Sequence, residues 1–209
     1  MQVSKWAYLG AVSSLATLCG LTGARAETVI TFADPSSGPA TPLFSYSGNT
    51  LTGGWAGPGL TLQTPGLTNT DYSNATFTMT ALSRTSDSGS VHFLSGGELN
   101  FFDSGDNLLL TIEFASAELS GPLGLGASDF IGDNVTFSGP VLGGESFTNE
   151  AFAFAFANPI GTLSDFTVTA SFTSSGDPMI PGPGSAALLG SGVMGLWRRR
   201  RPPNVALRQ

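Results

Sequence analysis

The chain has almost no basic side chains away from its two ends. It carries eight lysines and arginines against fifteen acidic residues, and between Glu27 and Ile180 the only lysine or arginine is Arg84. All fifteen acids lie in that interval, which gives it a formal charge of −14. Because affinity for phosphate backbones comes from lysine and arginine, this composition argues against nucleic-acid binding. It favours solubility and attracts basic or divalent partners.

Cysteine and histidine are equally scarce. Cys19 is the single cysteine and lies in an N-terminal segment expected to be removed, so no disulfide or thiol chemistry is predicted for the mature chain. His92 is the single histidine, too few for the usual zinc ligand set. It alternates with the apolar Val91 and Phe93, which predicts a satisfied or solvated surface histidine on the more polar face of a strand. The glutamates could supply the carboxylate pair of a glycoside hydrolase, but their spacing singles out no pair. We therefore expect no enzyme.

The first 26 residues have the layout of a secretory signal. Lys5 supplies the positive start, and residues 6–21 form a mostly apolar stretch. Ala24 and Ala26 satisfy the small-x-small rule for signal peptidase, which predicts a mature chain that begins at Glu27.

A second signal occupies the C-terminal end. A proline/glycine breaker and a short apolar segment at 185–197 are followed by a basic stop; the breaker and stop residues are Pro181, Gly182, Pro183, Gly184, Arg198, Arg199, Arg200 and Arg201. As a helix, the apolar segment reaches only about 20 Å, whereas a bilayer core takes about 30 Å. Its arginines are expected to stay in the cytoplasm. The short reach favours a removable anchor over a permanent C-terminal membrane helix, which is the alternative.

This order of elements resembles the PEP-CTERM sorting tag of bacterial envelope proteins. The resemblance implies that an exosortase-like membrane enzyme recognises the Pro-x-Pro element and removes the anchor. It also implies a protein held for a time in the inner membrane, then found at the cell surface or outside it, near exopolysaccharide. Gly182 stands where the family usually has Glu, and residues 202–209 continue past the basic cluster, where the family usually ends.

Between the two signals, apolar residues alternate with polar or small ones. Phenylalanines alternate with alanines in residues 151–157, and apolar residues alternate with Thr and Ser in residues 165–173. This period of two is typical of antiparallel strands with one face in a core. Further strands are expected at 28–32, 76–80, 91–94, 99–102, 108–114 and 135–137, with a turn at 95–97. The side chains predicted inside are Phe77, Phe101, Leu110, Phe114, Phe154, Phe166, Val168 and Phe172.

Many short strands separated by turn residues predict an all-β fold, an antiparallel β-sandwich of jelly-roll type. An N-terminal signal helix precedes it and a short C-terminal membrane helix follows it. The predicted organisation is a signal peptide at 1–26, an exported domain at 27–174, a Gly/Pro spacer at 175–184, the anchor segment with its arginine stop at 185–201, and a cytoplasmic tail at 202–209.

Two kinds of ligand site are candidates in the exported domain. Asp103, Asp106 and Asn107 cluster oxygen ligands that suit calcium, although the same residues are ordinary turn formers; residues 129–134 form a similar cluster. Trp55 and Tyr72, with Tyr46, are the aromatic candidates for stacking on sugars. The leading hypothesis is a non-catalytic surface or matrix protein. A carbohydrate-binding module, an ice-binding protein using the Thr-rich stretches at 76–80 and 167–173, and a glycoside hydrolase are the alternatives.

Overall fold

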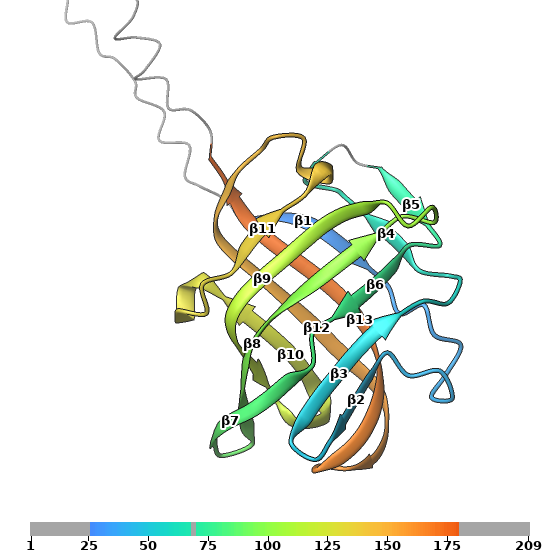
Figure 1. Ribbon diagram of the computed structural model, residues 1–209, viewed down its shortest axis with the longest axis vertical. Coiled ribbons are helices and arrows are strands. Elements are labelled where there is room, and N and C mark those ends of the chain that lie inside the picture. Colours follow the sequence, from blue (N-terminus) through green and yellow to red (C-terminus); the bar gives the residue numbers. More distant parts are fainter. Residues whose placement is uncertain (1–25, 68–69, 180–209) are drawn as a thin grey trace, which may run out of the picture.

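The computed structural model describes residues 26–67 and 70–179, which form one antiparallel sheet of thirteen strands (Figure 1). The strands are β1 (Glu27–Phe32), β2 (Phe44–Ser47), β3 (Thr50–Trp55), β4 (Thr61–Gln63), β5 (Asp71–Ser73), β6 (Thr76–Met79), β7 (Leu82–Ser88), β8 (Val91–Phe102), β9 (Leu108–Leu119), β10 (Gly124–Ser128), β11 (Thr136–Ser138), β12 (Phe147–Thr162) and β13 (Asp165–Pro178). Three 3-10 turns, η1 (Gly121–Leu123), η2 (Asp129–Ile131) and η3 (Pro140–Leu142), lie in the connections.

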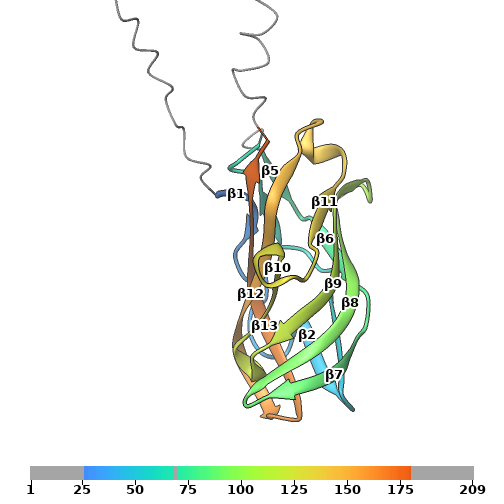
Figure 2. The ribbon, with the colours of Figure 1, turned by 90° about the vertical axis from the view of Figure 1, so that its left-hand side faces the viewer.

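The sheet closes into a barrel because β12 and β13 pair with each other from Phe147 opposite Pro178 to Thr162 opposite Asp165. The eight strands of the ring are β12, β10, β9, β8, β6, β3, β2 and β13. β7 pairs with β3 and β8, β11 pairs with β9, and β1, β4 and β5 continue from β13. Seen from the side the barrel is flattened, with β1, β12 and β13 on one side and β6, β8 and β9 on the other (Figure 2).

The all-β, antiparallel class predicted from the sequence is confirmed, but the jelly-roll sandwich is not what forms. A sandwich needs two sheets with free edges, and here the β12–β13 pairing bonds the seam that a sandwich would leave open. Closure removes exposed edges, which would otherwise present unpaired backbone groups to other chains. The predicted signal helix and membrane helix lie outside the described residues. Within those residues, no helix has the length and apolar run needed to cross a membrane.

The predicted core is confirmed. All eight expected side chains are buried, from 0% exposure for Phe101 and Leu110 to 5% for Phe114. In β12 the alternation places Phe152 and Phe154 inside and leaves Ala153 and Ala155 exposed. The Phe154 ring lies 4.7 Å from the Phe172 ring and 4.8 Å from the Phe44 ring, measured between centroids. The interior is therefore a packed aromatic cluster.

The predicted turn at 95–97 is wrong, because β8 runs unbroken through it and pairs with β9 on both sides. A Cβ on Gly96 would lie 2.6 Å from the Phe114 carbonyl oxygen. Glycine here permits a close approach of two strands rather than a reversal of the chain.

Both ends of the described domain meet at one end of the barrel. Glu27, where β1 begins, lies opposite Gly176 in β13. β13 continues to Pro178, so the sheet extends into the segment that the sequence assigned to the spacer. The β2–β3, β7–β8 and β12–β13 hairpin turns lie at the far end (Figure 1). Of the predicted processing residues, Ala26 and Glu27 are described; Ala24, residues 181–184 and residues 198–201 lie outside the described residues.

Candidate functional site

A polar cluster at the far end joins the only arginine and the only histidine of the described residues. Asp87 and His92 face each other across the β7–β8 hairpin, and His92 Nδ1 lies 2.6 Å from Asp87 Oδ1. The Arg84 guanidinium donates to Asp87 Oδ2 and, at 3.2 Å, to Asn49 Oδ1. The Arg84 backbone N–H also donates to the Asn49 carbonyl at 2.8 Å. The cluster therefore ties the β7–β8 hairpin to the turn between β2 and β3.

His92 is a satisfied histidine, as one form of the prediction had it, because its ring bonds to Asp87. Its ring does not lie on the more polar face of β8, however, but against Tyr46. Its ring is nearly parallel to the Tyr46 ring, with centroids 5.8 Å apart and 10° between planes. The His92 side chain is 17% exposed, and Tyr46 is buried. Leu94, two residues on, marks the inner face of this part of β8, whereas Val91 and Phe93 are half-buried on the other face.

The charges in this cluster stabilise one another. Hydrogen bonds from Arg84 and then His92 lower the pKa of Asp87 below its usual value. Asp87 and then Tyr46 raise the pKa of Arg84. The Tyr46 hydroxyl lies near enough to Arg84 to favour its charged form, although among the described residues it has no partner of hydrogen-bond geometry. The Arg84 and Asp87 side chains are about one-third exposed, and ion pairs between exposed side chains contribute little to stability. Their contacts indicate a structural tie.

The calcium candidates form a tight turn between β8 and β9. Asp103 Oδ1 accepts hydrogen bonds from the backbone N–H groups of Gly105 at 2.8 Å and Asn107 at 2.9 Å. Asp103 Oδ2 accepts from Asn107 Nδ2 at 2.9 Å. These bonds, those from Asn107 first, lower the pKa of Asp103. The structure thus brings Asp103 and Asn107 together around a turn, with Asp106 in the left-handed region at φ 61°. Calcium binding stays a prediction.

In the second acidic cluster, carboxylates accept hydrogen bonds from backbone N–H groups of the segment 128–137. Asp133, buried, accepts from the Ser128 backbone N–H at 3.0 Å, and Asp129 accepts from the Val135 N–H at 2.6 Å. Glu150 is 7% exposed and accepts from the Phe137 N–H at 3.2 Å. Burial raises the pKa of Glu150, and the nearby charge of Asp129 adds to the rise. Among residues 26–67 and 70–179, no group of three His, Cys, Asp or Glu side chains is arranged to hold a metal.

The aromatic candidates for sugar stacking lie against the core. Tyr46 is 1% exposed, so the expectation that it stacks on a sugar is wrong: its inward place in β2 buries the ring. Trp55 and Tyr72 are partly buried and pack against the core. Trp55 also lines a hollow of ≈ 590 Å³ with Phe102 and Asp106.

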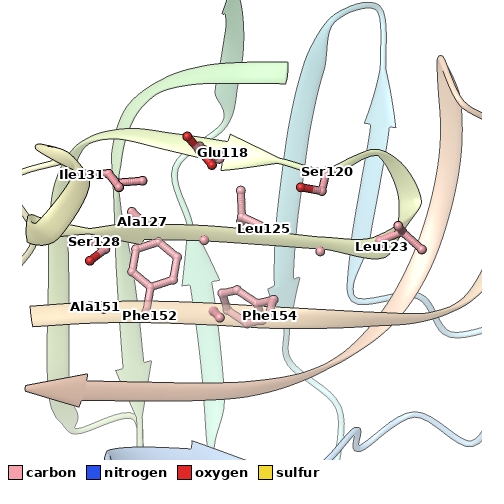
Figure 3. A pocket seen from close by; sticks show the side chains of 13 residues that line it. Glu118, Ser120, Leu123, Leu125, Ala127, Ser128, Ile131, Ala151, Phe152 and Phe154 are labelled. Carbon is pink, nitrogen blue, oxygen red and sulfur yellow. The ribbon is translucent and has the colours of Figure 1, made fainter. Parts of the chain in front are cut away.

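A hollow on the outer surface runs along β10 between β9 and β12 (Figure 3). We call it the β10 groove; its volume is ≈ 430 Å³. Gly124 and Gly126 form its floor, and opposite them on β12 stand Ala155 and Ala153. Its other lining residues are Glu118, Ser120, Leu123, Leu125, Ala127, Ser128, Ile131, Ala151, Phe152 and Phe154. Leu123 and Ile131, 75% and 55% exposed, stand at its opposite ends (Figure 3).

A row of residues without a charged side chain extends beyond the groove over several strands. Paired from strand to strand, this row consists of Gly126 on β10, Ala153 on β12, Thr173 on β13, Thr31 on β1 and Gln63 on β4. The next residue of the row, Asp71 on β5, is charged. We call this surface the neutral face. A second depression, lined by Thr31, Gln63, Ser171 and Thr173, shares Ala153 with the β10 groove. Sequence reasoning missed this site, although the alanines of residues 151–157 were its signal.

The structure also brings Glu98 and Glu113 opposite each other on the outer surface of β8 and β9. Glu113 is exposed, and Asn100 Nδ2 donates to Glu98 Oε1. This carboxylate pair was not distinguishable in the sequence, because fifteen residues separate its members. Comparison with protein-family models, with curated proteins and with solved structures finds no match to this chain.

Proposed function

We propose that the chain is an exported, non-catalytic protein of the cell surface or extracellular matrix, associated with exopolysaccharide. The observation that carries the proposal is the order of Pro181 to Gly184, the short apolar segment 185–197 and Arg198 to Arg201, which resembles the PEP-CTERM tag. Signal peptidase and an exosortase-like enzyme are the processing partners. The protein is anchored for a time in the inner membrane and then released to the surface.

The architecture of the domain supports this route. A cut after Ala26 removes no residue of β1, which begins at Glu27. Glu27 pairs with Gly176, so both ends of the described domain lie at the same end of the barrel. If the chain is anchored in the membrane through the residues after 180, the far end and the sides of the barrel stay accessible. A domain tethered at one end in this way can present a large lateral surface to a matrix.

Mass spectrometry of the exported protein tests the proposal. The mature chain is expected to begin at Glu27 and to end between Pro181 and Gly184. Replacing Arg198 to Arg201 by Gln should weaken retention at the membrane, because the basic stop holds that end in the cytoplasm. Deleting residues 181–209 should bypass processing. Recovery of the chain in membranes with Gln209 intact would mean a permanent anchor.

A carbohydrate-binding module is the second candidate, and the β10 groove is the observation that favours it. The ice-binding alternative has less support, because the two Thr-rich stretches lie on β6 and β13, which are not neighbours in the sheet. Thr169 is also fully buried. A glycoside hydrolase would have to use a pair such as Glu98 and Glu113, which lies on the outer sheet surface.

A further inference from the structure

We propose that the β10 groove binds a segment of an uncharged, hydroxyl-rich polymer, a neutral glycan strand laid along β10. This inference rests on the proposed association with polysaccharide, and it adds the site and the charge of the ligand. It also moves the sugar site away from the aromatic residues that the sequence suggested.

The shape of the groove suits a linear polymer. Five residues of β10 at about 3.3 Å each span about 17 Å, from the end near Leu123 to the end near Ile131. Its volume of ≈ 430 Å³ falls within the range of ligand clefts, about 300–1,000 Å³. Its lining residues come from β9, β10 and β12 along the sheet, so the groove follows the direction of β10 (Figure 3).

The floor of the groove depends on its two glycines. A Cβ on Gly124 would lie 2.8 Å from the Phe154 carbonyl oxygen, and one on Gly126 would lie 3.1 Å from the Phe152 carbonyl oxygen. Any larger residue would both fill the hollow and press on β12. Glycine in a strand interior costs conformational entropy and often marks a close backbone approach. Here it also leaves the backbone of β10 uncovered by side chains.

The charge of the groove selects against anionic polymers. Glu118 is the one charged residue among those lining it, and the lining has no basic side chain. Arg84, the one arginine of the described residues, is committed to Asp87 and Asn49 in the far-end cluster. The surrounding domain carries a formal charge of −14. A uronate-rich or sulfated chain would meet only repulsion here, whereas a neutral chain pays no such cost.

The lining chemistry matches the two surfaces of a sugar ring. The exposed aliphatic side chains of Leu123 and Ile131, with the methyl groups of Ala151 and Ala153, can cover the C–H faces. The Glu118 carboxylate accepts hydrogen bonds from hydroxyl groups, and the Ser120 hydroxyl both donates and accepts. Leu123 and Ile131 stand apart at the two ends instead of forming one patch, which is a poor match for docking against another protein.

Affinity electrophoresis of the full chain, in a detergent without sugar groups, tests the inference. The gels contain hydroxyethyl cellulose as a neutral polymer or polygalacturonate as an anionic one. The wild-type chain should be retarded by the neutral polymer and not by the anionic one. Ala153→Trp, which fills the groove from an exposed position, should weaken the interaction at least tenfold. Glu118→Gln, which keeps the side-chain shape, should weaken it several-fold.

Thr136→Trp is the matched control, because Thr136 is exposed beside Glu113 and does not line the groove. It should bind as the wild type does, and circular dichroism should give the same β spectrum for all variants. The inference is overturned if the neutral polymer does not retard the wild type, if Ala153→Trp and Thr136→Trp behave alike, or if polygalacturonate binds better. It is also overturned if sedimentation shows a dimer that only Ala153→Trp disrupts, since the groove would then be an interface between two copies.

The two proposals can fail separately. Ala153→Trp leaves both processing segments unchanged, so its mature ends should equal those of the wild type. Correct mature ends without retardation by neutral polymer would remove only the glycan site. Retardation with an intact Gln209 would remove only the proposed export and release route.

Discussion

Two parts of one closed sheet present opposite surfaces to the solvent. In the row through Gly126, Ala153 and Thr173, the neutral face carries no charged side chain. On β8 and β9, by contrast, Glu98 and Glu113 stand directly opposite each other. The inner sides of both regions are alike, with Phe154 buried under one and the Leu99–Ile112 pair buried under the other. Burial dictates what points inward, so the outer surface is where sequence can vary to suit a partner.

The largest expected effect is the difference in stability between replacing an inward-facing and an outward-facing side chain of β12. Phe154→Ala should lower the free energy of unfolding by about 3–5 kcal/mol, through lost burial and the cavity left among the rings. Ala153→Ser, one residue away on the neutral face, should change it by less than about 0.5 kcal/mol. Urea denaturation of both variants measures the contrast. Equal losses would show that the two sides of the strand are not as assigned.

A smaller difference in stability is expected between alanine substitutions at a glycine of β8 and at a glycine of β10. The Cβ of Gly96→Ala would lie 2.6 Å from the Phe114 carbonyl oxygen and 2.7 Å from that of Ala115, both backbone atoms. We expect a loss of about 1–3 kcal/mol from the overpacking. Gly126→Ala, whose Cβ would lie 3.1 Å from the Phe152 carbonyl oxygen, should cost less. The melting temperatures of the two variants give the order, and the reverse order would contradict the close β8–β9 approach.

Removing one acid from the acidic region should stabilise the fold. Like charges directly opposite in a sheet are unfavourable, so Glu113→Lys should raise the free energy of unfolding by about 0.2–1 kcal/mol. The gain should shrink in 1 M salt, where exposed charges are screened. Ala153→Lys on the neutral face, which has no carboxylate opposite it, is the control and should show no comparable gain.

The buried carboxyl of Glu150 should make the protein less stable as the pH rises. Its pKa is raised by burial, so its contribution is fully present below the ordinary glutamate pKa of about 4.3 and is lost as the pH passes the raised value. Glu150→Gln, which resembles the protonated form, should melt higher than the wild type at pH 7 and no higher at pH 3. A gain that does not depend on pH would point to packing instead.

The smallest effect is expected at Asp87, with the opposite sign. Arg84 and then His92 lower its pKa, so its contribution is present above the ordinary aspartate pKa of about 3.9 and is lost as the pH falls through the lowered value. Asp87→Asn should therefore melt below the wild type at pH 7, with the two curves converging in acid. Curves that stay apart at pH 2 would contradict the ionic origin of this difference.

Some structural features were open to prediction because their causes are local. The alternation of Phe152 and Phe154 with alanines identified a strand and its buried side without any partner strand. Asp103 and Asn107 belong to a turn whose hydrogen bonds lie within five residues. The β2–β3 hairpin had a usable signal that sequence reasoning passed over. Gly48 and Asn49 both adopt positive φ, at 57° and 67°, as a two-residue hairpin turn requires.

The candidate site was much harder to predict, because its parts are distant in the chain. The floor of the β10 groove comes from residues 124–126, whereas its wall comes from residues 151–154, and only pairing brings them together. Arg84 meets Asn49 across 35 residues in the same way. His92 was misplaced because its alternation with Val91 and Phe93 did not reveal which side of the strand the barrel would bury.

By itself, the sequence determined the all-β class, the inward phenylalanines and the acidic character of the domain, whereas the signals at both ends stay predictions. These depend on side-chain period, composition and order, which neighbouring residues express whatever they pack against. Only the tertiary structure decided that β12 and β13 close the sheet into a barrel, that Tyr46 and His92 turn inward, and that glycines and alanines meet in one groove. Backbone hydrogen bonds are nearly the same for any two strands, so strand partners are chosen by packing of the whole core.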